Sequence, residues 1–206
     1  MTVDDLNTET IRKRLAMARG TPLADPYPDG YFSTPPRAAA VLLPLYRDEE
    51  WKLLFIRRSH NDDDRHSGQV AFPGGRVDPH DADETAAALR EAHEEIGLEE
   101  RDVTVLGQLS SYRTVSNYLV TPVVAEINWP LTFRLDPTEV SRVFSIPLRW
   151  LAEPQNRRVN QRHLHGFDVS MPVHYYERYD DELLWGVTAK ITVGFLQLLG
   201  VMNAET

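Results

Sequence analysis

Hydrophobic positions in this chain gather into short runs of strand length, separated by residues typical of turns. Several runs are rich in Val, Ile, Leu and aromatic residues, a composition that favours strands. The charged tetrapeptide "RDEE" is expected to join the first two as a turn. The pattern predicts strands over residues 38–46, 51–58, 69–75, 102–112, 118–127, 142–148 and 171–179.

Three other segments favour helices. Ile11 and Leu15 lie four positions apart in a polar setting, which predicts a short amphipathic helix near the amino end. A second helix is predicted from Asp81 to Ile96, opened by "DADE", an Asp-x-x-Glu form of the capping box. A third is predicted over 188–201; its run "ITVGFLQLLGVM" is too short to span a bilayer and indicates a buried helix. Mixed strands with few helices predict an α+β sandwich, a sheet flanked by helices.

Chain length and the positions of proline and glycine indicate one main domain. The 206 residues suffice for one substantial core. A Pro- and Gly-rich connector, "GTPLADPYPDGYFSTPP", follows the first predicted helix and is too short to link two large domains. We therefore predict an amino-terminal helix and connector over 1–35 and a folded domain over 36–202.

Charge and composition exclude several classes of function. The chain has no cysteine, which excludes disulfides, thiolate nucleophiles and thiolate metal sites and fits a reducing compartment. Its formal net charge of -9 argues against general binding of nucleic acid, and an anionic ligand would need metal ions or a local basic patch. The acidic amino end is unlike a transit peptide and no apolar signal core follows, so a cytoplasmic protein without membrane contact is expected.

The stretch "REAHEEIGL" holds an unusual concentration of acids near a helix end. Glu91, Glu94 and Glu95 are neighbours on a helix, where like-charged pairs cost roughly 0.2–0.5 kcal/mol each. They precede Gly97, a residue typical of a helix stop, so the helix dipole is unfavourable to them as well. Such a placement needs a compensating interaction.

A divalent metal site is the compensation that the pattern favours. On a helical wheel Glu84 falls in the same sector as the other three acids, and Ala87 and Ala88 beside them leave the acids uncovered. We expect a separate face to pack on the sheet, formed by Leu89, Ala92 and Ile96. A merely solvated face would normally intersperse lysines four residues on, and none occurs here. Converging carboxylates without a cation suit Mg²⁺ or Mn²⁺.

The preceding stretch, "RRSHNDDDRHSGQVAFPGG", suits phosphate chemistry. Arginine pairs with phosphate oxygens in bidentate fashion, and glycine lets the backbone approach a ligand or metal closely. Arg57 and Arg58 alternate on a predicted strand, so one of the two is expected to point inward. Taken singly, each glycine also fits an ordinary turn. The residues in question are Arg57, Arg58, Arg65, His66, Gly68, Gly74 and Gly75.

Together these stretches resemble the Nudix hydrolases. "GGRVDPHDADETAAALREAHEEIGL" is similar to the family signature Gly-x5-Glu-x7-Arg-Glu-U-x-Glu-Glu-x-Gly-U, with U a bulky apolar residue. Its second half matches, with Ala92 as a small residue at the first U position. Its first half departs, because Asp81 stands at the glutamate position with one extra residue before Arg90. Asp81, Asp83 and Glu84 all remain open as the replacement for that glutamate.

The sequence that flanks this signature resembles the coenzyme A pyrophosphatase branch of the family. This resemblance rests on "RHSGQVAFPGG" and on the longer, Asp-containing form of the signature, which we call the box. The later segments "EVSRVFSIPL" and "LWGVTAKI" are also similar to that branch. The resemblance spans roughly residues 38 to 200 and implies a Nudix-type α/β/α sandwich with a mixed β-sheet flanked by helices. It also implies hydrolysis of the diphosphate of coenzyme A to 3',5'-ADP and 4'-phosphopantetheine, with Mg²⁺ or Mn²⁺.

The resemblance assigns roles to named residues. It implies that Glu91 and Glu95, with Glu94 and Gly75, hold the metal, and that Arg90 orients a glutamate. The general base stays open between a box glutamate such as Glu94 and Glu139, which precedes a predicted strand. Substrate contacts are implied for Arg57, Arg58, Arg65, His66, Gly68 and Gln69.

Other functions stay open for this chain. A Nudix hydrolase of ADP-ribose or of a nucleoside triphosphate would share the acidic helix, and a non-catalytic Nudix-fold nucleotide-binding module would normally lose box acids. The basic run "NRRVNQRHLH" either receives a ligand phosphate, such as the 3'-phosphate of coenzyme A, or is a solvated turn. A small-molecule substrate is the expected partner, and a homodimer is left open.

Overall fold

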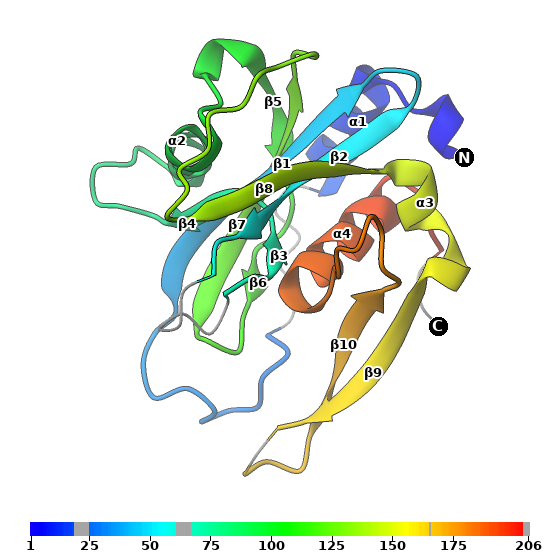
Figure 1. Ribbon diagram of the computed structural model, residues 1–206. Coiled ribbons are helices and arrows are strands. Elements are labelled where there is room, and N and C mark those ends of the chain that lie inside the picture. The colour runs from blue at the N-terminus through cyan, green and yellow to red at the C-terminus, as the bar shows by residue number, and fades with distance from the viewer. Residues whose placement is uncertain (19–24, 61–66, 165, 204–206) are drawn as a thin grey trace.

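A mixed β-sheet forms the centre of the protein (Figure 1). A computed structural model describes residues 1–18, 25–60, 67–164 and 166–203. The central strand β1 pairs in parallel with β7, and the remaining pairs of this sheet are antiparallel. The strands of the sheet are β1 (Arg37–Arg47), β2 (Trp51–Arg58), β3 (Val70–Ala71), β4 (Gly74–Arg76), β5 (Val103–Gln108), β6 (Tyr112–Arg113), β7 (Tyr118–Ile127) and β8 (Val140–Pro147).

Helices cover both faces of this sheet (Figure 1). Helix α2 (Glu84–Ile96) lies on one face, and α1 (Thr8–Ala18), α3 (Leu148–Ala152) and α4 (Gly186–Leu198) lie on the other. Three short 3-10 helices complete the described helices: Val3–Asp5, Glu100–Asp102 and Pro154–Asn156. The predicted α/β/α sandwich with a mixed sheet is therefore confirmed.

A separate two-stranded hairpin extends away from the sandwich (Figure 1). Its strands are β9 (Arg157–His163) and β10 (Ser170–Tyr176), paired antiparallel. The basic run "NRRVNQRHLH" was expected to be a phosphate site or a solvated turn, and most of it forms β9. Its side chains are almost all exposed, so no hydrophobic alternation marked it as a strand.

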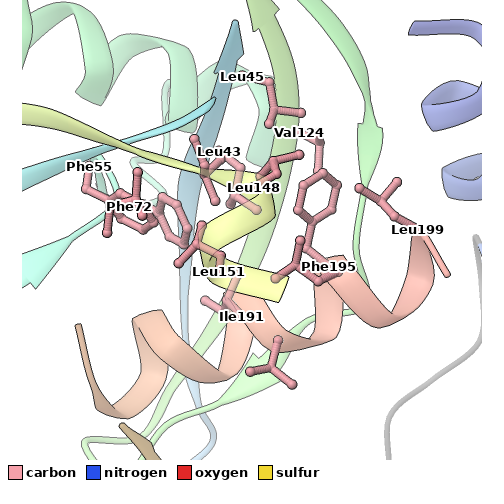
Figure 2. Packing of buried hydrophobic residues seen from close by; sticks show 14 of the residues in the cluster. Leu43, Leu45, Phe55, Phe72, Val124, Leu148, Leu151, Ile191, Phe195 and Leu199 are labelled. Carbon is pink, nitrogen blue, oxygen red and sulfur yellow. The ribbon is translucent and has the colours of Figure 1, made fainter. Parts of the chain in front are cut away.

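The sheet has one core on each face, and the two differ in the size of their side chains. Figure 2 shows the larger core, where long aliphatic and aromatic side chains of the sheet meet α3 and α4. Phe195 on α4 is fully buried there against this layer. On the other face, α2 contributes mainly alanines, among them Ala88 and Ala92. The sheet and α2 can therefore approach closely.

The predicted helices form, with corrected boundaries. Ile11 and Leu15 are buried on α1, as the spacing predicts. Helix α2 begins at Glu84 rather than Asp81, because Asp83 is the N-cap: its carboxylate accepts a hydrogen bond from the backbone N–H of Ala86. The carboxyl-terminal helix starts two residues before the predicted 188 and ends at Leu198, three before the predicted 201.

The predicted faces of α2 were partly wrong. Ala87 and Ala88 do not leave open space beside the acids; they are fully buried against the sheet together with Ala92. Leu89, expected to be buried, is only partly covered. Alanine is favoured in this contact because β1 passes close to the helix, and a longer side chain would push the two apart.

Candidate active site

The carboxyl-terminal end of α2 is fixed by a crossing loop. Gly97 adopts a left-handed conformation with φ of 68°, which ends the helix. Two of the carbonyls left unpaired at this end accept hydrogen bonds from the loop that precedes β8: Arg134 N donates to Ile96 O at 3.0 Å, and Asp136 N donates to Glu95 O at 2.9 Å. This holds the loop that carries Glu139 against the acidic end of the helix.

Gly74 and Gly75 bring the backbone of β4 against the acids. A Cβ atom on Gly75 would lie 2.5 Å from Oε1 of Glu91, so a larger residue would displace this carboxylate. Gly74 has a φ of 153° and packs on the β1 backbone, and its N–H donates to Oε2 of Glu95 at 3.0 Å. The glycine pair is thus part of the site and not only a turn.

Glu95 is the most buried of the box acids. Its side chain is 1% exposed, and its Oε1 lies 3.8 Å from Nη1 of Arg58. Burial raises the pKa of the Glu95 carboxyl to about 8, and the negative charges of Glu139 and Glu91 add to the rise, while Gly74 N–H and Arg58 oppose it. A cation at this position would favour the charged form.

Glu91 and Glu94 are progressively more exposed. The Glu91 side chain is 16% exposed and that of Glu94 is 55% exposed. Burial raises the pKa of Glu91, partly offset by its hydrogen bond from Arg90. The acids that the helical wheel placed in one sector therefore span a gradient from the interior to solvent, with Glu94 at the outer end.

Arg90 ties the helix to the preceding loop. Its Nε and Nη2 donate to the two carboxylate oxygens of Asp81, both at 3.0 Å, and its Nη1 donates to Glu91 and to Glu94, also at 3.0 Å. Nη2 also donates to the carbonyl of Arg76 at 3.0 Å. Hydrogen bonding by Asp81 is the largest of the causes that raise the pKa of Arg90, so the guanidinium is firmly charged.

Asp81 is therefore the acid whose contacts match those expected of the missing first glutamate. It holds Arg90 by a bidentate pair, and this bond is the largest cause that lowers the pKa of Asp81. Asp83 instead caps α2, and the described contacts give Glu84 no partner.

Glu139 acts on the acids from the loop that precedes β8. It ends the loop that crosses α2, and its backbone N–H donates to Asp136 O at 3.1 Å. After burial, its negative charge is among the causes that raise the pKa of both Glu91 and Glu95. Glu139 thus acts electrostatically on both acids.

A hard divalent cation fits these donors. Oε1 of Glu95 is buried and makes no hydrogen bond to any described residue, and Glu91 lies beside it against Gly75. Within the described ranges, no three His, Asp or Glu side chains are already grouped as a metal-binding set. Nη1 of Arg90 holds Glu91 and Glu94. A metal bound by Glu91 and Glu95 would supply a partner for the buried Oε1 of Glu95.

The predicted substrate residues do not all gather at this site. Arg58 reaches Glu95, whereas Arg57 pairs with Glu182 at 3.4 Å, so one of the two points toward the acids. The backbone of Gln69 accepts a hydrogen bond from Arg58 N at 3.0 Å, and Gly68 has a φ of 68° in the turn before it. Arg65 and His66 lie outside the described residues.

Two contacts of the site escaped the sequence analysis. One is the hydrogen bond from the backbone N–H of Gly74 to Glu95, because a pattern of side chains does not show where a backbone N–H will donate. The other is the pairing of Arg58 with Glu95 across strand and helix. The alternation of Arg57 and Arg58 could have indicated that one would face the acidic helix, but not which one.

Comparison with known proteins decides the family. A model of the NUDIX domain matches residues 35–174. The chain belongs to the Nudix family. Among its relatives, the uncharacterized Nudix hydrolase NudL of Photorhabdus laumondii is 39% identical over 170 residues, covering 81% of this chain and 87% of that protein. The protein of the same name from Yersinia pestis (strain Pestoides F) is 37% identical over 161 residues, covering 78% of this chain and 79% of its own.

Solved structures agree on the fold. A MutT/nudix family protein from Enterococcus faecalis superimposes with a TM-score of 0.50, covering 84% of this chain and 70% of that one at 17% identity. As a Nudix hydrolase, this chain acts on a nucleoside diphosphate derivative, a chemistry for which the family generally uses divalent metal ions. No helix in the described part of the chain is long and apolar enough to cross a membrane.

Proposed function

We propose that this Nudix hydrolase cleaves the diphosphate of coenzyme A or its derivatives, yielding 3',5'-ADP and 4'-phosphopantetheine. The proposal rests on the segment "RHSGQVAFPGG", which leads into the box. This segment resembles the coenzyme A pyrophosphatase branch. This text leads into the site, since it passes through β3 and ends at Gly74 and Gly75. A substrate-selecting segment at this point would touch the same ligand as the acids.

Glu91 and Glu95 are the proposed metal ligands, with Glu94 and the Gly75 backbone as further candidates for the same cation. When bound, Mg²⁺ or Mn²⁺ supplies positive charge that screens the diphosphate and makes a water more acidic. Gly74 N–H and Arg58 hold Glu95 in place. Arg58 is also close enough to the acids to contact a diphosphate there, so we assign it a substrate role.

Arg90 is the proposed positioning residue. It holds Glu91 and Glu94 from one side while Asp81 anchors it from the other. This arrangement fixes the side-chain rotamers of both glutamates before a ligand arrives, which lowers the entropy lost on binding.

Glu139 is the proposed general base, in preference to Glu94. Its charge acts on both Glu91 and Glu95, which supports a position close to both proposed metal ligands. Glu94 is held by Arg90 at the outer end of the acids, and its side chain is more than half exposed. A carboxylate that accepts a proton must reach that water directly or through one further water.

Product analysis tests the proposal. The protein is incubated with Mg²⁺ or Mn²⁺ and offered coenzyme A and ADP-ribose separately. We expect 3',5'-ADP and phosphopantetheine from coenzyme A at a much higher kcat/KM than any cleavage of ADP-ribose. Cleavage of ADP-ribose alone would overturn the choice of substrate. Metal and nucleotide binding without any turnover would favour a non-catalytic binding module.

A further inference from the structure

Two arginines converge on one tyrosine beside Gly74 and Gly75. Arg76 directly follows Gly75 on β4, and Arg37 begins β1. Their guanidinium carbons lie 5.8 Å and 4.1 Å from the ring centroid of Tyr118, the first residue of β7. We call Arg37, Arg76 and Tyr118 the arginine–tyrosine stack.

Hydrogen bonds hold both arginines in place. Nε of Arg76 donates to the hydroxyl of Tyr118 at 2.9 Å, and Nη2 of Arg37 donates to the carbonyl of Ser116 at 3.3 Å. The sheet register makes the first bond possible: β1 lies between β4 and β7, and Ala39 is the residue paired with Arg76. Because Ala39 is small, the Arg76 side chain can pass over β1 to reach Tyr118.

No acid in the part of the chain that the structure describes pairs with the positive charge of the stack. Among the described residues, neither Arg37 nor Arg76 forms an ion pair, whereas Arg57, Arg58 and Arg90 all do. Each guanidinium has five N–H donors, and the hydrogen bonds above use one of each. Two cations over one ring repel each other, and an anion bound between them would remove that repulsion. Both side chains are exposed, so an anion can reach them.

The stack lies within reach of a ligand bound at the acids. The carbonyl of Arg76 accepts a hydrogen bond from Arg90, and Gly75 touches Glu91. Successive side chains of a strand alternate, so Arg76 points to the opposite face from Gly75. Among the described strands β4 pairs only with β1, so no described strand covers its other edge.

We infer that the arginine–tyrosine stack binds a phosphomonoester of the substrate that is separate from the scissile diphosphate. The inference rests on the proposed function, since coenzyme A carries such a group and ADP-ribose does not. Arginine forks match phosphate oxygens, and the tyrosine holds the forks in a fixed orientation. The basic run on β9 is a weaker candidate, because Arg158 is already paired with Glu177 at 2.6 Å and the hairpin extends away from the sandwich (Figure 1).

The test compares two nucleotides that differ only in the remote phosphate. Isothermal titration calorimetry with 3',5'-ADP and with 5'-AMP measures binding without requiring turnover. We expect the unaltered protein to bind 3',5'-ADP about tenfold or more tightly, because charge-assisted hydrogen bonds to the second phosphate add to affinity. In R37A/R76A this preference should vanish while affinity for 5'-AMP stays within about twofold.

Matched variants guard against indirect effects. Arg47 lies over the Trp51 ring, with a centroid distance of 5.9 Å, at the other end of β1, and R47A should leave both affinities unchanged. R37K/R76K keeps the charge without the planar fork and should retain only part of the preference. An unaltered protein without preference, or an R37A/R76A variant that keeps it or loses both affinities equally, would overturn the inference.

Kinetics separate this inference from the proposed function. The unaltered protein and R37A/R76A are each assayed with coenzyme A and 3'-dephospho-coenzyme A. We expect R37A/R76A to raise KM for coenzyme A alone. If the unaltered protein cleaves neither compound, the proposed function fails, and the calorimetry still decides the inference. If it cleaves coenzyme A and R37A/R76A still distinguishes the two compounds, the function stands and the stack is overturned as a phosphate site.

Discussion

The two faces of the central sheet are built differently. The face toward α3 and α4 is filled by large side chains, with Phe195 fully buried among leucines and other aromatic residues (Figure 2). The face toward α2 packs the alanines of the helix against aliphatic side chains of the sheet such as Leu42 and Ile56, and it encloses a carboxylate, Glu95, at 1% exposure. Both faces bury apolar area, which stabilises the fold, and the α2 face also brings backbone and acids close together, which builds a site.

The difference shows where the protein tolerates an unfavourable group. A buried carboxyl with a raised pKa is costly on its own. The closely packed α2 face holds it through Gly74 N–H and Arg58, while the opposite core supplies apolar burial that is independent of the site. Changes on the two faces should therefore separate activity from stability.

Replacing Glu95 should produce the largest effect, and it should fall on activity. In Glu95→Gln the hydrogen bond from Gly74 N–H can persist, so the fold should be kept, while loss of the carboxylate should reduce metal-dependent kcat by about 10³-fold or more. Steady-state assays with Mg²⁺ and urea unfolding measure the two quantities. Glu99→Gln, just beyond α2, is the control and should retain activity. Retained turnover in Glu95→Gln would disprove its role as a metal ligand.

Truncating Phe195 should produce the reverse result. Phe195→Ala removes a fully buried ring from the larger core and should lower the free energy of unfolding by about 3–5 kcal/mol. The site on the other face is untouched, so kcat per folded molecule should change little. Val187 lies on the same helix and is 37% exposed, and Val187→Ala should cost less than about 1 kcal/mol. Equal losses in the two variants, measured by urea unfolding, would contradict this account of the core.

The metal-free protein should lose stability as pH rises. The Glu95 carboxyl titrates near 4.5 when unfolded and at about 8 when folded, so the folded state binds the extra proton between these values. Unfolding free energy should then fall between about pH 5 and pH 8.5, by on the order of 4 kcal/mol. Urea unfolding in EDTA at both pH values measures it. Glu95→Gln should flatten this dependence, and an equally steep slope in the variant would assign the titration to another group.

Asp81 and Asp83 offer the finest test, because two nearby acids should act on different quantities. Asp81→Asn weakens the bidentate hold on Arg90 and should lower kcat/KM by about 10- to 100-fold. Asp83→Ala removes the N-cap of α2 and should cost about 1 kcal/mol of stability with little change in kcat/KM. Kinetics and urea unfolding on both variants decide the matter. A larger kinetic loss in Asp83→Ala would make Asp83 the acid that supports the site.

Much of this arrangement follows from local patterns. The strand-length apolar runs, the acidic end of α2, the glycine pair and Arg90 all carry signals that depend on residue type and spacing alone. The sequence analysis failed where the signal was not local. Strand β9 has almost no buried side chain, so its hairpin pairing left no alternation in the sequence. The start of α2 was misplaced because "DADE" indicated a capping box at Asp81, whereas Asp83 caps the helix and Asp81 pairs with Arg90.

By itself the sequence determined the family, the acidic helix and the kind of ion it suits, because these depend on which side chains are present and how far apart they lie. Only the tertiary structure decided that Asp81 anchors Arg90, that Arg58 rather than Arg57 faces Glu95, and that Arg37 and Arg76 meet on Tyr118. The physical reason is that burial, pKa and ion pairing depend on neighbours brought together by sheet pairing and helix packing, often from distant parts of the chain.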